Sequence, residues 1–350
     1  MRHMQSVPWQ FLFRRRANSR NRNLELDTST LREQHALPWA VSRPARHFNK
    51  RHDSTSMAPP TTRKVFGRTL VDVSEQDTLE REFFARVKLP NGTFKSTGAN
   101  RMDDLNAAVF PYIAAIDERP VKIMDVGASS GVSTLEWFEC LSGERVTCDV
   151  TATDLIVHAS LVSLAPSLAV LIDRDRNILH MDVLGQGAPP VAKGLEGIFA
   201  GMIRMLFRVA MKVDDRLPPL NGRTQEAATG RVLKCEPVTL LTKRLAQHES
   251  LSLRVIEDDL LAANRPQFNE VFHVVRAANI LNRCYFSDQV LVQIVNKLKE
   301  SIKQNGLLVV CRTEHNGANN ATIFQSTDSK FRVLQRLGSG SEIEDLITGI

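Results

Sequence analysis

The residues best placed to do chemistry form the pattern D-x-G-x-S-x-G, which runs from Asp125 to Gly131. Apolar residues at positions 121, 123, 124 and 126 surround the aspartate and predict a buried strand with a carboxylate at its end. Two glycines with small residues between them let the backbone turn sharply or pass close to a ligand. The residues from Ser133 onward predict a helix, and α/β folds bind ligands where a helix begins after a parallel strand.

Two other glycine motifs do not fit this turn. A dinucleotide-binding loop would need glycine where the chain has Ser129 and Val132. A phosphate-binding loop would need Gly-Lys and then Ser or Thr, beginning five residues after Gly127, and Val132-Ser133 stand there instead. The turn therefore indicates neither a dinucleotide nor a phosphate cradle.

The pattern resembles the cofactor-binding turn of class I S-adenosylmethionine-dependent methyltransferases. The resemblance covers about residues 100–340, apart from an insertion at about 155–235. It implies a Rossmann-like α/β sheet that is mostly parallel, with helices on its faces, an antiparallel C-terminal strand pair, and an inserted hairpin and helical cap. It also implies S-adenosylmethionine as cofactor and an unidentified methyl acceptor, either a small molecule or a protein side chain. The implied cofactor-binding residues of the turn are Asp125, Gly127, Ala128, Ser129 and Gly131.

The resemblance assigns further acidic residues to the ends of the next two predicted strands. Asp154 ends the strand predicted over 145–155, where the family places an acid that accepts hydrogen bonds from the ribose hydroxyls. Residues 257–259 close the strand predicted over 251–256, where the family often has an acid near the adenine amino group. Asp258 is the first choice for that role and Asp259 the second. The apolar side chains of Ile256 and Leu260 are predicted to sandwich the adenine. Ordinary turn and capping acids are the alternative interpretation.

The loop after the fourth predicted strand shows a second, local resemblance. Residues 274–287 are similar to the segment R-N-x-L-x-x-F of chemotaxis-receptor glutamate methyltransferases, although two alanines separate the Arg and the Asn here. Because this loop follows a strand, Arg276, Asn279 and Tyr285 are predicted to line the methyl-transfer side of the pocket as candidate catalytic residues. Hydrogen bonds that only stabilise the loop are the alternative.

Positive charge is concentrated at the start of the chain. Residues 1–64 carry 13 Lys or Arg residues and four acidic residues, a net charge of +9, and the whole chain is +6, so residues 65–350 carry −3. The composition of residues 1–64 predicts a disordered basic extension, and residues 65–350 a methyltransferase-like domain. Residues 1–24 contain six Arg and no acid, so a transit peptide and an organellar location are an alternative to the cytoplasm. The acidic remainder gives no electrostatic reason to expect a nucleic-acid partner.

Cysteine and hydropathy patterns indicate a protein of a reducing compartment. The five cysteines are scattered without a C-x-x-C pair, which predicts free thiols and no metal site. No run of about 18 uncharged apolar residues predicts a spanning helix. Residues 195–213 predict an amphipathic helix that covers the pocket, with peripheral membrane contact through its basic side as an alternative. The oligomeric state stays open.

The remaining predictions concern other elements and the function. They include a helix capped by Asp103 or Asp104 and running through Ile116, a hairpin at 169–172 and 178–181, a loop at 214–235, a helix at 289–304 ended by Asn305-Gly306, and strands at 307–311, 322–325 and 331–337. His180, His273 and Tyr285 are candidate bases by residue type alone. A non-catalytic methyltransferase-like binding protein is the alternative function. It stays open because the part of the chain predicted to bind the methyl acceptor has no motif such as N-P-P-[YF], which is typical of amino-group methylation. An α/β protein that binds another nucleoside is a third possibility.

Overall fold

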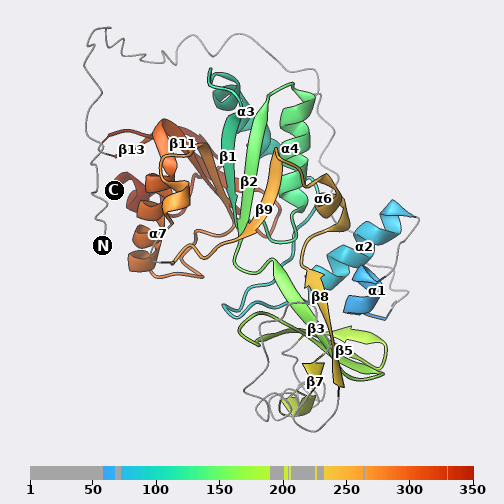
Figure 1. Ribbon diagram of the computed structural model, residues 1–350. Coiled ribbons are helices and arrows are strands. Elements are labelled where there is room, and N and C mark those ends of the chain that lie inside the picture. Colours follow the sequence, from blue (N-terminus) through green and yellow to red (C-terminus); the bar gives the residue numbers. More distant parts are fainter. Residues whose placement is uncertain are drawn as a thin grey trace, which may run out of the picture. The chain divides into compact units, whose positions relative to one another are not determined.

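The motif turn follows a strand in the middle of a seven-stranded sheet, whose order is β13-β12-β11-β10-β1-β2-β9 in the computed structural model (Figure 1). The five strands from β11 to β9 are parallel, whereas β12 is antiparallel to β11 and β13 is antiparallel to β12. The prediction of a mostly parallel Rossmann-like sheet with an antiparallel C-terminal pair is therefore confirmed. The strands are β1 (Val121–Val126), β2 (Cys148–Asp154), β9 (Leu253–Glu257), β10 (Phe272–Ala278), β11 (Ile302–Thr313), β12 (Asn319–Ser326) and β13 (Phe331–Leu337).

The structure describes residues 58–67, 72–189, 201–203, 205, 225–226, 232–262, 265–328 and 330–350. Most of the predicted basic extension lies outside these residues. Its last part, residues 58–64, is described, and helix α1 (Thr62–Phe66) begins there. The predicted boundary at residue 64 falls inside this helix. From Ser56 onward the chain forms one compact unit.

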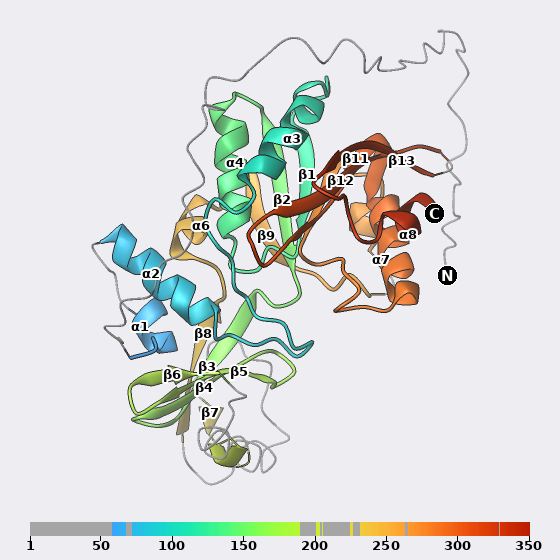
Figure 2. The ribbon, with the colours of Figure 1, turned by 180° about the vertical axis from the view of Figure 1, so that it is seen from behind.

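Helices cover both faces of the central sheet, and this explains why β1, β10 and β11 bury apolar residues on both of their faces. Successive residues of β1 point to opposite faces: Ile123 packs with α3 (Asp103–Ala114), α4 (Val132–Gly143) and α6 (Lys243–His248), and Met124 with α7 (Asp288–Ser301) and α8 (Glu344–Thr348). Figure 2 shows α7 and α8 beside the sheet near β11 and β13. Among the described residues, no helix is both long and apolar enough to cross a membrane.

Two predicted helix ends are wrong. Helix α3 begins after Met102, and neither Asp103 nor Asp104 caps it. Helix α7 ends at Ser301, because β11 starts pairing with β10 at Ile302. The pairing of β11 with β10 shifts register between Ile302 and Leu307. Asn305-Gly306 was predicted to end the helix, but it lies within this irregular part of β11.

A second sheet is inserted between β2 and α6. It has six antiparallel strands in the order β6-β5-β4-β3-β8-β7. The predicted hairpin is confirmed as β4 and β5. The prediction of a loop over 214–235 is wrong at residues 225–226 and 232–233, because β7 pairs there with the start of β8. Of the helix predicted at 195–213, the structure describes residues 201–203 and 205, which are helical, and the rest lies outside the described residues. The strands are β3 (His158–Ala165), β4 (Leu168–Ile172), β5 (Ile178–Val183), β6 (Gln186–Ala188), β7 (Gln225–Glu226) and β8 (Val232–Thr239).

Asp182 attaches helix α1 to this inserted sheet. Its carboxylate accepts hydrogen bonds from the Thr62 backbone N–H at 2.9 Å and the Thr62 hydroxyl at 3.0 Å. The imidazole Nδ1 of His180, which is fully buried, lies 3.3 Å from the same oxygen. An acceptor at the N-terminus of a helix satisfies N–H groups that have no partner within the helix.

We expect the Asp182→Ala substitution to lower the free energy of unfolding by about 1–3 kcal/mol, because it leaves buried donors without an acceptor. Urea denaturation of the full chain measures this change. Asp175→Ala is the matched control, because the Asp175 side chain in the same hairpin is 72% exposed. Equal denaturation midpoints for the two variants would contradict the assignment.

Candidate functional site

A cavity of about 450 Å³ lies at the carboxyl ends of β1, β2, β9 and β10. Its volume is in the range of pockets that bind small molecules. Residues from the segment before α3 form a further part of its wall. The structure thus brings together predicted site residues from four separate strands, and these are Asp125, Gly127, Ala128, Ser129, Asp154, Asp258, Asp259, Arg276, Asn279 and Tyr285.

Gly131 is the one predicted site residue that does not line the cavity. Its backbone is left-handed, with φ of 88°, and a Cβ atom there would lie 2.0 Å from the side chain of Leu245. The glycine is therefore required for the packing of α6 against the start of α4. Gly127 differs, because it lines the cavity, has φ of 74° and meets only the Ile280 side chain at 3.4 Å.

Asp125 is engaged in a buried ion pair with Arg276. The guanidinium donates from Nε to Oδ1 at 2.8 Å and from Nη2 to Oδ2 at 2.7 Å, and the Thr134 hydroxyl donates to Oδ2 at 2.6 Å. A third guanidinium nitrogen donates to the Asn106 side chain at 3.1 Å. The pair joins the end of β1 to β10 and α4. This geometry favours a positioning role for Arg276, and its predicted catalytic role stays a prediction.

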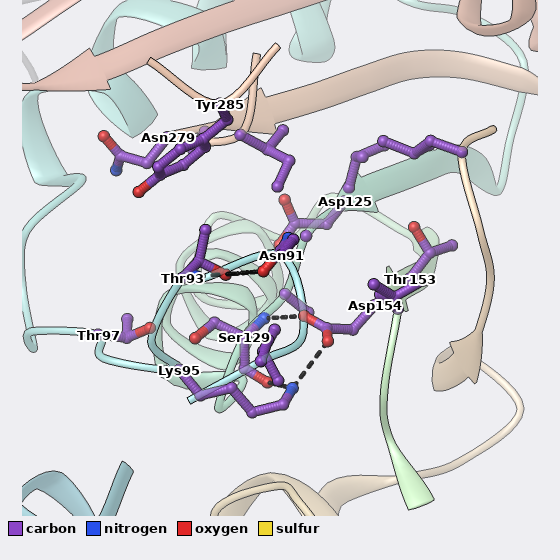
Figure 3. Close-up of a pocket in the computed structure, with 18 of the residues that line it drawn as sticks. Asn91, Thr93, Lys95, Thr97, Asp125, Ser129, Thr153, Asp154, Asn279 and Tyr285 are labelled. Atoms are coloured by element: carbon purple, nitrogen blue, oxygen red, sulfur yellow. Dashed lines mark hydrogen bonds and ion pairs between the residues drawn. The ribbon is translucent and has the colours of Figure 1, made fainter. Parts of the chain in front are cut away.

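Asp154 is also paired with a cation. The Lys95 ammonium lies 2.8 Å from Oδ1, and the backbone N–H of Ser129 donates to Oδ2 at 2.7 Å (Figure 3). The Ile156 backbone N–H donates to Oδ1 at 3.2 Å. Sequence reasoning missed Lys95, because a single lysine after a turn is usually exposed and nothing in its neighbourhood marks it as a partner of Asp154.

The two acids after β9 differ in their surroundings. Asp258 forms a bidentate ion pair with Arg265, with Nε to Oδ1 at 3.1 Å and a second contact from Nη2 to Oδ2, and both side chains are buried. Asp259 is exposed and accepts a hydrogen bond from the Leu261 backbone N–H at 2.9 Å. Leu260, predicted to pack against an adenine ring, lines the cavity. Ile256, predicted with it, does not.

Asn279 and Tyr285 both line the cavity from the loop after β10 (Figure 3). The Asn279 side chain accepts a hydrogen bond from the Thr313 N–H at 2.7 Å and donates to the Thr313 hydroxyl at 3.1 Å. Its backbone is left-handed, with φ of 62°, which is costly for a residue other than glycine. These contacts favour the loop-stabilising interpretation for Asn279. The Tyr285 side chain is 49% exposed at the cavity wall.

Polar atoms without partners are concentrated at this cavity. In the described part of the chain, six buried side-chain polar atoms lack a hydrogen-bond partner, and three of them belong to residues that line it. Native proteins rarely leave such atoms unsatisfied, so the concentration indicates that a ligand or water completes the site. Figure 3 shows the side chains of Thr97 and Ser129 pointing toward each other. The three residues are Thr97, Arg101 and Ser129.

Residues 127–131 also match G-x-S-x-G, the spacing of the nucleophile elbow in serine hydrolases, which sequence reasoning missed. A nucleophilic serine needs an adjacent base. The Ser129 hydroxyl has no hydrogen-bond partner, and among the described residues no histidine lines the cavity. His180 is buried in β5, and the His273 ring lies against the Lys122 backbone and Glu118. The described geometry therefore gives no support to a serine hydrolase.

Comparison with known proteins gives similarities to solved structures only. No protein-family model matches the sequence, and no curated protein does. A 1,6-didemethyltoxoflavin-N1-methyltransferase from Burkholderia thailandensis, solved with S-adenosylhomocysteine, is 12% identical with a TM-score of 0.33, over 72% of this chain and 68% of that one. The citrinin polyketide synthase CMeT domain is 12% identical with a TM-score of 0.30, over 71% of this chain. The N-methyltransferase NodS from Bradyrhizobium japonicum is 9% identical with a TM-score of 0.25, over 61% of this chain and 62% of that one.

These similarities concern the fold alone, and at such TM-scores they add no argument about activity. The chain spans 41% of the citrinin polyketide synthase domain structure and 38% of the DszA carbon methyltransferase structure. The argument for the fold comes from the chain itself, through the parallel strands, the turn after β1 and the cavity at the strand ends. This protein has a Rossmann-like α/β fold, with a mostly parallel central sheet and an antiparallel C-terminal strand pair.

Proposed function

We propose that this protein transfers a methyl group from S-adenosylmethionine to an acceptor that is a small molecule or a protein side chain. The observation that carries the proposal is the cavity, which collects the glycine turn after β1 and acidic residues at the ends of β1, β2 and β9. A nucleoside with an amino-acid moiety offers hydroxyl and amino groups that such acids bind. It carries no phosphate, which agrees with the missing phosphate-binding loop.

The residues present fit the cofactor in several respects. The unpartnered hydroxyls of Thr97 and Ser129 supply polar groups for it, and Asp154 supplies a carboxylate for the ribose. Leu260 and Leu261 supply apolar surface for the base. When bound, the cofactor supplies the electrophilic methyl group. The chain then has to exclude water and align the acceptor with the reacting carbon, and alignment is enough for an acceptor that is already nucleophilic.

Calorimetric titration of the full chain with S-adenosylmethionine and with S-adenosylhomocysteine tests the proposal. We expect both to bind in a one-to-one ratio, because both carry the nucleoside and the amino-acid moiety that the cavity is proposed to hold. Absence of binding by either ligand at millimolar concentration would overturn the proposal. Adenosine in a parallel titration separates a site for the whole cofactor from a site for another nucleoside, since only the former gains affinity from the amino-acid moiety.

One observation favours a second candidate, a non-catalytic methyltransferase-like protein that binds a ligand and regulates a partner. Asp125, Asp154 and Asp258 are each already paired with a cation of the chain, which reduces their capacity to bind a ligand. The two functions are distinguished by following S-adenosylhomocysteine formation from S-adenosylmethionine with a panel of acceptors. Binding without turnover across the panel would favour the second candidate. Peripheral membrane contact through residues 195–213 stays a proposal for either.

A further inference from the structure

A short segment before α3, Leu89–Thr97, forms one wall of the cavity and carries Lys95. Its start is held by the backbone N–H of Lys88, which donates to the Leu179 carbonyl of β5 at 3.0 Å. A bridge between Lys88 and Phe94 closes a turn in it. The segment thus extends from the inserted sheet to Asp154 at the end of β2, the residue predicted to bind the ribose. Figure 3 shows Lys95 beside Asp154.

The Lys95 side chain is fully buried. Its ammonium is 2.8 Å from Asp154 Oδ1 and 3.0 Å from the Ser129 carbonyl oxygen, which also belongs to the cavity wall. A buried ammonium needs a charged partner, because removing it from water is costly. Asp154 is the one carboxylate that ion-pairs with Lys95 among the described residues. Lys95 is therefore held in place by the same group that is expected to bind the ribose.

The carboxylate of Asp154 has few free positions for accepting further hydrogen bonds. A carboxylate offers about four acceptor positions. Three donors already use Asp154: the Lys95 ammonium, the Ser129 N–H and the Ile156 N–H. The two N–H donors belong to the turn after β1 and to the chain just after β2, so they are fixed by the fold. The remaining position accommodates one ribose hydroxyl, and the second hydroxyl needs the position that Lys95 occupies.

We infer that Lys95 is an affinity-determining residue that competes with the ribose of the bound nucleoside for Asp154. The inference rests on the proposed function. Binding through both hydroxyls moves the ammonium off the carboxylate and into a more accessible position. Gly92 and Gly98 flank the part of the segment that carries Lys95, and the space around each is open, so the backbone there has room to adjust. A ligand that displaces Lys95 exposes this side chain, whereas a pocket that merely closes over its ligand would protect it.

Amine labelling of the wild-type full chain tests the displacement. Lysines are reductively methylated with and without saturating S-adenosylhomocysteine, and peptides containing Lys95 and Lys88 are quantified by mass spectrometry. We expect Lys95 to be protected in the free protein and labelled several-fold faster in the complex. Lys88, which lies just before this segment and does not line the cavity, is expected to react equally in both. Labelling of Lys95 that is unchanged or slower in the complex would overturn the inference.

A pair of variants measures the competition. Lys95→Met keeps a long side chain without charge, and Lys88→Met is the matched control. We expect Lys95→Met to bind S-adenosylhomocysteine about tenfold more tightly than wild type, because a charged hydrogen bond is freed for the ligand. Lys88→Met should bind like wild type. If wild type and both variants bind but Lys95→Met is no tighter, the inference fails and the proposed function stands. If none of the three binds, the proposed function itself fails.

Discussion

Replacing Arg276 by methionine is expected to lower the free energy of unfolding by about 3–5 kcal/mol, because it leaves the buried Asp125 carboxylate without its cation. The guanidinium is 1% exposed and makes two hydrogen bonds to Asp125. It also lies 4.0 Å from the centre of the Trp137 ring, a cation–π contact that methionine would lose. Urea denaturation of the full chain measures the change.

Arg283→Met is the matched control for this prediction. Arg283 lies in the loop after the same strand and pairs with Asp288 and Asp345, but its side chain is 40% exposed. Solvent and salt screen ion pairs at the surface, so we expect a much smaller effect than for Arg276. The double variant Asp125→Asn and Arg276→Met should be less destabilised than the sum of the single variants, because each removes the partner of the other. If the effects of the two substitutions on the free energy of unfolding are additive, the Asp125–Arg276 ion pair is not the source of the lost stability.

Much of the fold could be predicted because its signals are local. An apolar run such as Val271–Val275 indicates a strand covered on both faces, and β10 occupies that place in the sheet. The acids at 125, 154 and 258 could be expected together because the carboxyl ends of neighbouring parallel strands meet at one edge. The hairpin of β4 and β5 was visible from two short apolar runs on either side of a polar turn.

The parts that could not be predicted depend on contacts between distant residues. Lys95 and Asp154 are 59 positions apart, and no local pattern relates them. Gly131 was assigned to the ligand because glycine suits both a ligand turn and tight packing, and only the position of Leu245 decides between them. Strand β8 alternates polar and apolar residues only weakly, so its pairing with β3 shows only in the folded chain. The cation partners of Asp154 and Asp125 could not be predicted for the same reason, since Lys95 and Arg276 come from distant parts of the sequence.

Asp154→Ala is expected to weaken S-adenosylhomocysteine binding by about 1–3 kcal/mol, which is roughly 5- to 150-fold in the dissociation constant. The alanine removes the carboxylate that accepts the ribose hydroxyls. Asp154→Asn keeps the shape and one acceptor oxygen, and should lose less, because neutral hydrogen bonds are weaker than charged ones. Asp149→Asn, on the same strand but outside the cavity, is the control. Calorimetry that gives wild-type affinity for Asp154→Ala would mean that the ribose partner is misassigned.

Calorimetry also tests whether Lys95 affects ligand affinity through Asp154. If the ammonium weakens binding only by occupying the carboxylate, then Lys95→Met should tighten binding in the wild-type background and have no effect on affinity in the Asp154→Ala background. The double-mutant cycle isolates this coupling, because the two side chains contact each other directly at 2.8 Å. An equal gain in both backgrounds would show that Lys95 acts on the ligand by another route, such as charge repulsion across the cavity. A gain confined to the intact carboxylate would identify Asp154 as the group for which lysine and ligand compete.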